Sequence, residues 1–287
     1  NKKYEEIQKN RKENKYEIDK LYLDYWTNKI NLQKNKNNIN FITYGNDKFK
    51  LAKERILKEA LQFDVFNNIK GYGPEDLPNV FYEKYKNILM NSRGGGYWLW
   101  RPLIIHDALE KMNDNEFLVY LDAGCVINKE GKERFLEYID LLDKNENNYG
   151  IMSFQMSGNK GPGNLEKEKC WTIKQIFDYF DIEPESEIGN SGQYLGGILI
   201  MKKNEHLKNY MKKYIQIILE KPDLCSDIYN NKNQHKYFRE NRHEQSITSI
   251  LRKIEGSVVI DGDESFMQPF GKGESLKYPF WAARLRK

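Results

Sequence analysis

The chain has 287 residues, 39% of them hydrophobic and 31% charged, a balance typical of a globular protein with a substantial core. Lys and Arg number 46 against 42 Asp and Glu, and because the basic residues are scattered along the chain we exclude a nucleic-acid-binding protein. No apolar run approaches the roughly 18 residues of a membrane span. No signal peptide is visible and the three cysteines lie far apart, so we expect a cytoplasmic setting, although the first residue is Asn and leaves open a preceding segment.

The first part of the chain predicts a helical extension followed by alternating strands and helices. Residues 1–38 form the extension, with apolar residues at helical spacing along one stripe. A strand over 39–44 ends in a Gly-Asn-Asp turn, and a helix follows with Phe49, Ala52, Ile56, Ala60 and Phe63 on one face. Residues 64–66 predict a short second strand, residues 71–74 a loop, and Pro78 opens the next helix.

The alternation continues toward the middle of the chain. A Gly-Gly-Gly break at 94–96 precedes a helix near Pro102, and then come a strand over 117–121, a helix after Gly131 and a strand over 151–154. This order predicts an α/β fold with a mostly parallel, Rossmann-like sheet and helices on both faces.

The remaining pattern is less regular. We predict a loop over 155–169, a helix capped by Thr172, and a second loop over 181–193. An apolar strand over 194–201, a helix over 205–220, a polar stretch over 221–242, a helix over 243–254 and a strand over 258–260 follow. Because no repeat or linker is evident, residues 39–287 predict a single domain.

Asp122 is the main candidate for chemistry, because it ends an apolar strand where open α/β sheets bind ligands. Gly124 permits a sharp turn and close approach of a ligand. An oxygen ligand here suits Mg²⁺ or Mn²⁺ bridging to a diphosphate, since phosphates and waters supply the other ligands. A turn or cap aspartate is the plainer alternative.

Aromatic and basic residues near Asp122 predict a site for an anion with a flat surface. Arg93 and Arg101 suit phosphates, and Trp98 is either a stacking platform or part of the core. The glycines that follow Arg93 are either a phosphate cradle or a hinge. Thr43, Tyr44 and Gly45 end the first strand on the same edge, where we expect contact with a base or a simple turn.

Two later segments complete the predicted site. His243 and Glu244 begin a helix. Glu244 suits a general base or a carboxylate at the reacting carbon, and His243 suits a metal ligand. The alternative is a solvated helix start, where an acidic residue is favoured by the helix dipole. Asn190 and Gln193 offer polar groups for sugar hydroxyls. Gly196 and Gly197 inside a strand indicate either a bulge or close approach by a ligand.

Taken in order, the segments FITYGND, GGGYWLWRP, LVYLDAGC, YLGGILIM and NRHEQSITSIL resemble blocks of bacterial and viral GT-A-type glycosyltransferases, over roughly residues 39 to 285. The resemblance implies a GT-A-like fold and gives Asp122 the place of the Asp-x-Asp motif that holds a metal and a nucleotide sugar. Gly124 stands where that motif has its second aspartate, which puts metal dependence in question.

We therefore expect transfer of a hexose from a nucleotide diphosphate sugar, with UDP as the expected carrier, to a hydroxyl of a glycan. Mn²⁺ or Mg²⁺ is the expected cofactor. The alternative is a non-catalytic module that binds glycans or nucleotide sugars on a degenerate transferase scaffold. A sugar-nucleotide pyrophosphorylase is disfavoured, because FITYGNDKFK lacks the glycine-rich basic loop that such enzymes need.

Overall fold

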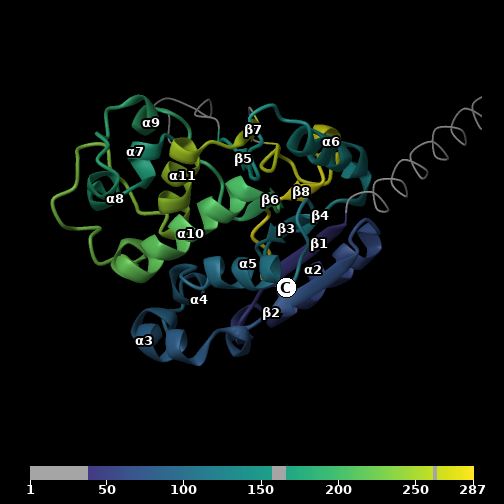
Figure 1. Cartoon of the computed structure of the whole chain (residues 1–287), viewed down its shortest axis with the longest axis horizontal. Coiled ribbons are helices and arrows are strands. Elements are labelled where there is room, and N and C mark those ends of the chain that lie inside the picture. The colour runs from purple at the N-terminus through teal and green to yellow at the C-terminus, as the bar shows by residue number, and fades with distance from the viewer. Residues whose placement is uncertain (1–37, 157–165, 261–263) are drawn as a thin grey trace, which may run out of the picture.

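The computed structural model describes residues 38–156, 166–260 and 264–287 (Figure 1). All but the last residue of the predicted extension over 1–38, and residues 157–165 of the predicted loop, lie outside the described residues.

The central sheet has four strands in the order β2, β1, β3, β6. Their bounds are Asn68–Tyr72 for β2, Ile39–Tyr44 for β1, Phe117–Leu121 for β3 and Ile198–Lys202 for β6. β1 runs parallel to β2 and β3, whereas β6 runs antiparallel to β3. The sheet is therefore mostly parallel, as predicted, and the carboxyl ends of β1 and β3 meet at one edge.

Helices cover both faces of the sheet (Figure 1). This covering is needed because β1, β3 and β6 carry mostly apolar side chains on both faces, which must be buried. The α-helices of the described residues are α2 (Lys50–Phe63), α3 (Asn79–Leu89), α4 (Gly94–Tyr97), α5 (Arg101–Glu110), α6 (Lys132–Asp143), α7 (Glu168–Trp171), α8 (Lys174–Tyr179), α9 (Glu187–Asn190), α10 (Glu205–Glu220) and α11 (Glu244–Glu255). One face of the sheet packs against α2 and α6 through residues such as Phe41 and Val119. The other face packs against α3, α5, α10 and α11 through residues such as Ile42 and Leu118.

Two short strand pairs extend the fold. β5 (Met152–Phe154) pairs in parallel with β7 (Val258–Ile260), and β4 (Val126–Ile127) pairs antiparallel with β8 (Phe280–Trp281). The β4–β8 pair brings the C-terminal residues against the turn that follows β3. In the part of the chain that the structure describes, no helix combines the length and apolar character needed to cross a membrane.

Several predicted elements differ from the structure. The second strand is Asn68–Tyr72, not 64–66, because Asp64 ends α2 in a left-handed conformation at φ 52°. Ile173, not Thr172, is the cap of α8, and the predicted loop over 181–193 contains α9. The strand predicted over 194–201 begins only at Ile198, since the segment before it bends past Arg101 and Gln245.

Candidate active site

A pocket of about 620 Å³ opens at the carboxyl ends of β1 and β3. Its walls come from the end of β1, the glycine turn at α4, the turn after β3, the start of α11 and the C-terminal residues. This is the edge at which α/β sheets bind ligands. The lining residues that carry chemistry are Tyr44, Lys48, Arg93, Trp98, Trp100, Arg101, Asp122, Arg242, His243, Glu244, Gln245, Arg284 and Arg286.

Asp122 faces the pocket, as the sequence predicted. Its backbone N–H donates to the Gly197 carbonyl at 2.9 Å, which fixes the turn after β3 against β6. One carboxylate oxygen, Oδ1, accepts from Arg101 Nη2 at 2.9 Å and from the Tyr120 hydroxyl. Oδ2 accepts no hydrogen bond from the described residues, and the side chain is 31% exposed. Asp122 therefore presents one open oxygen to a ligand.

Arg101 lies at the start of α5 and joins two carboxylates beneath the pocket. It is 2% exposed and pairs with Asp122 through Nη2 and with Glu244 through Nη1. Burial by itself lowers the pKa of Arg101, but Glu244, Tyr120 and Asp122 together raise it well above its ordinary value. The guanidinium is thus a permanently charged link that orients Asp122.

The surroundings of Glu244 do not suit the predicted role at the reacting carbon. Its carboxylate is 1% exposed, one oxygen accepts from Arg101, and the other accepts from the Tyr214 hydroxyl. A general base must reach the proton that it removes. Because both oxygens are engaged inside the protein, Glu244 is better suited to holding Arg101.

An aromatic wall borders the pocket. Tyr44 stacks on Trp100 with ring centroids 3.7 Å apart and planes at 18°. The Trp100 indole Nε1 donates to the Gly94 carbonyl at 3.0 Å, which ties this wall to the glycine turn. One ring face of Tyr44 is therefore already covered, and Trp98 lines the pocket beside it.

The glycine turn requires glycine for its backbone. Gly94, Gly95 and Gly96 have φ of 57°, 57° and 95°, values at which side chains are strained, and a Cβ on Gly96 would lie 2.5 Å from the Leu89 Cα. Arg93, just before the turn, lines the pocket but is paired with Glu240 and lies 3.8 Å from Asp227. Its charge is therefore already partly balanced.

Five other predicted residues do not line the pocket: Thr43, Gly45, Asn190, Gln193 and Gly196. Thr43 is fully buried and its hydroxyl donates to the Leu121 carbonyl at 2.8 Å, so it serves the sheet and not a base. Gly45 packs against α2, where a Cβ would lie 3.0 Å from Lys53 Cβ. Asn190, the last residue of α9, donates to the Glu185 and Ser186 carbonyls, which lie just before that helix.

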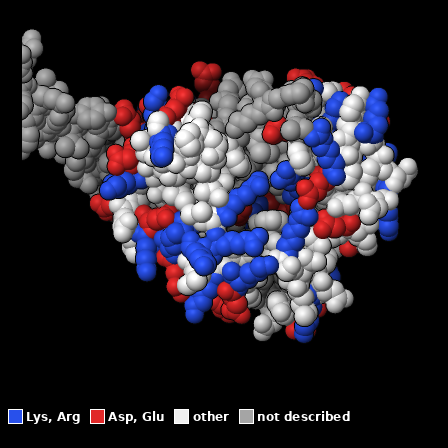
Figure 2. Space-filling view, turned by 180° about the vertical axis from the view of Figure 1, so that it is seen from behind, with Lys and Arg blue, Asp and Glu red and all other residues white. Residues whose placement is uncertain are grey.

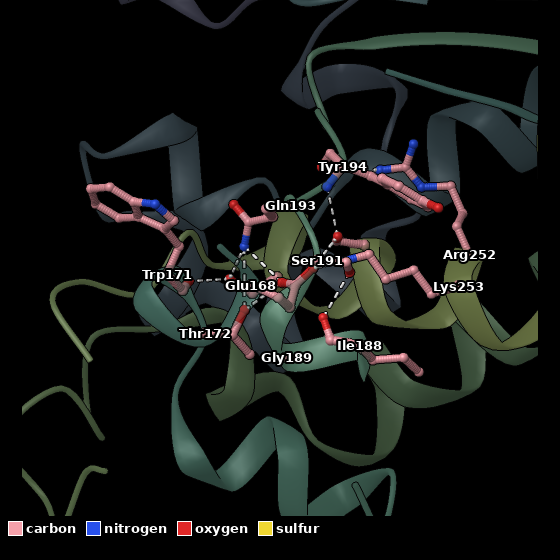
Figure 3. A network of polar contacts seen from close by, with 12 residues as sticks. Glu168, Trp171, Thr172, Ile188, Gly189, Ser191, Gln193, Tyr194, Arg252 and Lys253 are labelled. Carbon is pink, nitrogen blue, oxygen red and sulfur yellow. Dashed lines mark hydrogen bonds and ion pairs between the residues drawn. The ribbon is translucent and has the colours of Figure 1, made fainter. Parts of the chain in front are cut away.

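Gln193 belongs to a buried polar network behind the pocket, around Glu168 (Figure 3). It donates to Glu168 at 2.9 Å and accepts from Gln245 at 2.7 Å, and Gln245 in turn accepts from the Gly196 N–H at 2.9 Å. Glu168 also pairs with Lys253 at 2.6 Å, so the network locks α7 to α11. Gln193 thus supports the pocket wall from behind.

Gly196 and Gly197 make room for protein side chains. Gly197 also lines the pocket, whereas Gly196 does not, and approach by a ligand stays a prediction. A Cβ on Gly197 would lie 2.7 Å from Asp122 Oδ2, and one on Gly196 would lie 3.1 Å from Arg101 Nη1. The double glycine therefore lets Asp122 and Arg101 lie directly against the backbone before β6.

The residues around Asp122 do not fit a divalent cation held by protein ligands. His243 also lines the pocket, but its Nε2 lies 2.8 Å from the Asp227 carboxylate, and Arg101 already occupies Asp122 Oδ1. No group of three or more His, Cys, Asp or Glu residues that could hold a metal occurs among residues 38–156, 166–260 and 264–287. With one open oxygen beside a fixed guanidinium, a Mn²⁺ or Mg²⁺ ion here would take nearly all its ligands from phosphates and waters.

The sequence interpretation missed the basic residues that dominate the pocket. Lys48, Arg242, Arg284 and Arg286 line it together with Arg93 and Arg101, against only two acidic residues. Figure 2 shows Lys and Arg side chains gathered around a hollow on one face of the molecule. The RLRK run that ends the chain was the available signal, but its position in the sequence gives no indication that it folds onto this edge.

No protein-family model matches the chain, and no curated protein matches it. Among solved structures, it is similar to a glycosyltransferase involved in the glycosylation of the major capsid of PBCV-1, with 13% identity, a TM-score of 0.47, and coverage of 85% of this chain and 91% of that one. The glycosyltransferase GlyE of Streptococcus pneumoniae TIGR4 has 14% identity and a TM-score of 0.40, covering 78% and 45%. Mouse xyloside xylosyltransferase 1 has 12% identity and a TM-score of 0.38, covering 78% and 85%. Because these TM-scores are low, the functional argument below rests on the pocket residues.

Proposed function

We propose that the protein is a glycosyltransferase that moves a hexose from a nucleotide diphosphate sugar, with UDP as the first carrier to test, to a hydroxyl group of a glycan. The observation that carries the proposal is the open Oδ2 of Asp122 in a pocket that combines an aromatic wall with several cations. A nucleotide sugar offers the matching parts: a flat base, an anionic diphosphate and a sugar rich in hydroxyl groups.

Location and size support the same ligand. The pocket lies where parallel strands present their carboxyl ends, and about 620 Å³ is within the range of pockets that enclose small molecules. The resemblance of the LVYLDAGC and GGGYWLWRP segments to GT-A-type transferases adds a second, independent line of support.

In the proposed reaction, the acceptor hydroxyl oxygen bonds to the anomeric carbon. The bond from that carbon to the β-phosphate oxygen breaks, its electron pair stays on the departing nucleotide diphosphate, and the hydroxyl proton is released. Asp122 contacts the donor sugar through Oδ2, and Arg101 and Glu244 hold Asp122 in place. Preorganised groups of this kind stabilise charge that develops in the transition state.

The alternative, a binding module without activity, drew support from the missing second aspartate. Gly124 has a structural reason, however: a Cβ there would lie 3.1 Å from the Leu285 carbonyl oxygen. A side chain at this position would thus press on the C-terminal backbone, so the glycine has a packing reason and does not by itself indicate a degenerate site.

The test is release of nucleotide diphosphate from a panel of UDP-, GDP- and dTDP-sugars, with and without glycan acceptors, by wild type and by Asp122→Asn. Asparagine keeps an oxygen for Arg101 but loses the charge, so we expect a fall in turnover of about 100-fold or more. Asp114→Asn, which removes an exposed carboxylate paired with Lys208, is the control.

A thermal melt of each variant establishes that the fold is retained. Turnover that survives Asp122→Asn would reject the assignment of this residue. Binding without release of nucleotide diphosphate for any donor would favour the non-catalytic alternative.

A further inference from the structure

The C-terminal residues occupy the space beside Gly124 where an Asp-x-Asp motif would place its second side chain. The Leu285 N–H donates to the Gly124 carbonyl at 2.9 Å, and Arg284 Cα lies 3.2 Å from the position of a Cβ on Gly124. Arg55 holds the same arrangement from α2, donating to the carbonyls of Ala123 at 2.8 Å and Lys287 at 3.1 Å. An aspartate at position 124 would thus press on the backbone that carries Arg284 and place a carboxylate beside it.

That backbone brings two guanidinium groups to the pocket. Arg284 and Arg286 are exposed at its rim, and both line it. Within the described residues neither forms an ion pair, in contrast to Arg93 and Arg101, whose charges are matched by carboxylates. The pocket therefore holds cations in excess of its own anions.

Arg242 is the third guanidinium, and it approaches from the start of α11. It lies over the Trp171 ring at 4.0 Å, its Nε is buried without a hydrogen-bond partner, and it forms no ion pair in the described part of the chain. Burial lowers its pKa; Glu240 opposes this, whereas nearby Arg284 and Arg93 lower it further. Bringing like charges together costs free energy unless an anion joins them.

We propose that Arg242, Arg284 and Arg286 form a diphosphate-binding site that supplies, without a divalent metal, the positive charge that stabilises the leaving nucleotide diphosphate. This proposal rests on the proposed function and deepens it. Guanidinium groups bind phosphate oxygens through paired, charge-assisted hydrogen bonds, and three of them offer enough donors for two phosphates. The proposal also explains why the protein offers so few metal ligands around Asp122. The backbone that carries Arg284 lies beside Gly124, where an Asp-x-Asp motif has its second aspartate.

The experiment is calorimetric titration of UDP and of inorganic pyrophosphate into wild type, Arg242→Gln, Arg284→Gln and Arg286→Gln, in EDTA and again in Mn²⁺. We expect binding in EDTA that Mn²⁺ changes little, and a loss of affinity of about tenfold for each substitution. The matched control is Lys287→Gln, which removes one charge from the same segment, where Lys287 lines a separate surface hollow. Because Arg284 is exposed, its variant tests the site even where loss of the Arg242–Trp171 contact impairs folding.

Gly124→Asp provides a second, independent variant. It restores the Asp-x-Asp pattern, and we expect it to weaken binding in EDTA about as much as Arg284→Gln does. Unchanged affinity in EDTA for Gly124→Asp would contradict the role given to the C-terminal segment.

The outcomes separate this inference from the proposed function. Binding of UDP only in Mn²⁺, with equal affinity in the arginine variants, overturns the metal-free site and leaves a glycosyltransferase standing. Binding of pyrophosphate but not of UDP, sensitive to the arginines, supports the site and contradicts the uridine donor. No binding of either probe in either condition overturns both.

Discussion

At the scale of single residues, the pocket depends on buried charges that neutralise one another. Arg101 and Glu244 are 2% and 1% exposed, and removing one partner of such a pair leaves an uncompensated charge in the interior. The same residues were predicted from sequence as site residues, and the structure places both in the pocket lining. Because both are buried, they hold Asp122 in position, a role that their place in the sequence did not indicate.

Glu244→Ala should lower the free energy of unfolding by about 3 kcal/mol, because Arg101 keeps only Asp122 as a partner. Urea denaturation measures the loss. Glu240→Ala is the matched control, since it also removes a carboxylate from an arginine pair but at a side chain that is 39% exposed, where about 1 kcal/mol or less is expected. Equal losses in the two variants would contradict a buried role for Glu244.

Sequence reasoning identified Asp122, Tyr44, Arg93, Trp98 and Arg101, all of which line the pocket. Tyr44 and Asp122 were identified because they lie at the ends of apolar strands, which the topology brings together at one edge of the sheet. Arg93, Trp98 and Arg101 were identified by their basic and aromatic character beside a run of glycines. Thr43 and Gln193 were misplaced because their neighbours in space determine where a polar side chain bonds, and neither the Leu121 carbonyl nor Glu168 is near them in the sequence.

At the scale of elements, the sequence predicted best where apolar residues recur on a buried face. β1, β3 and α10 have the predicted bounds, and each is buried along a strand or a helical stripe. β2 was missed because it lies at the sheet edge and most of its residues are only partly buried, so Asn68–Tyr72 carries no apolar pattern. The segment before β6 was taken for strand because its glycines are flanked by apolar residues.

Gly197→Ala tests how the approach to β6 serves the site. The added methyl group would lie 2.7 Å from Asp122 Oδ2, which Arg101 and Tyr120 keep from moving freely. We expect a fall of at least tenfold in the turnover of the proposed reaction, with a small change in melting temperature. Gly71→Ala is the matched control, because its added methyl group would lie 2.8 Å from the end of the Leu57 side chain, at a glycine that does not line the pocket. Full activity in Gly197→Ala would show that the position of this carboxylate is not critical.

At the scale of the whole molecule, stability should depend on pH through buried histidines. Burial lowers the pKa of His235 and of His243, although hydrogen bonds to the Thr172 carbonyl and Asp227 oppose the shift. Below about pH 6.5, these two histidines therefore bind more protons in the unfolded chain than in the folded chain. The free energy of unfolding must then fall as the pH decreases from 7 through that value.

The free energy of unfolding in urea at pH 7, 6 and 5 measures this dependence. His235→Phe, placed among Phe177 and Phe238, should flatten the decline, whereas His106→Gln at an exposed position should leave it unchanged. If the free energy of unfolding declines equally with pH in wild type and His235→Phe, His235 is excluded as a source of the pH dependence.

The pocket also shows what could not be predicted at this scale. A mostly parallel sheet with helices on both faces follows from the alternation of strands and helices. The position of the C-terminal residues, in contrast, depends on the β4–β8 pair, whose strands have two residues each. Pairing that short leaves no pattern in a sequence. The cations that it brings to Gly124 were for that reason invisible before the structure.

One consequence concerns how a ligand would act on folding. The pocket takes its lining from positions as distant as Tyr44 and Arg286, so a partly folded chain that has assembled only one half of the molecule lacks a complete site. A nucleotide that binds there therefore recognises the finished fold alone, and at a hundred times its dissociation constant it would add about 2.7 kcal/mol to native stability. Such a ligand would rescue destabilised variants in cells in the manner of a pharmacological chaperone.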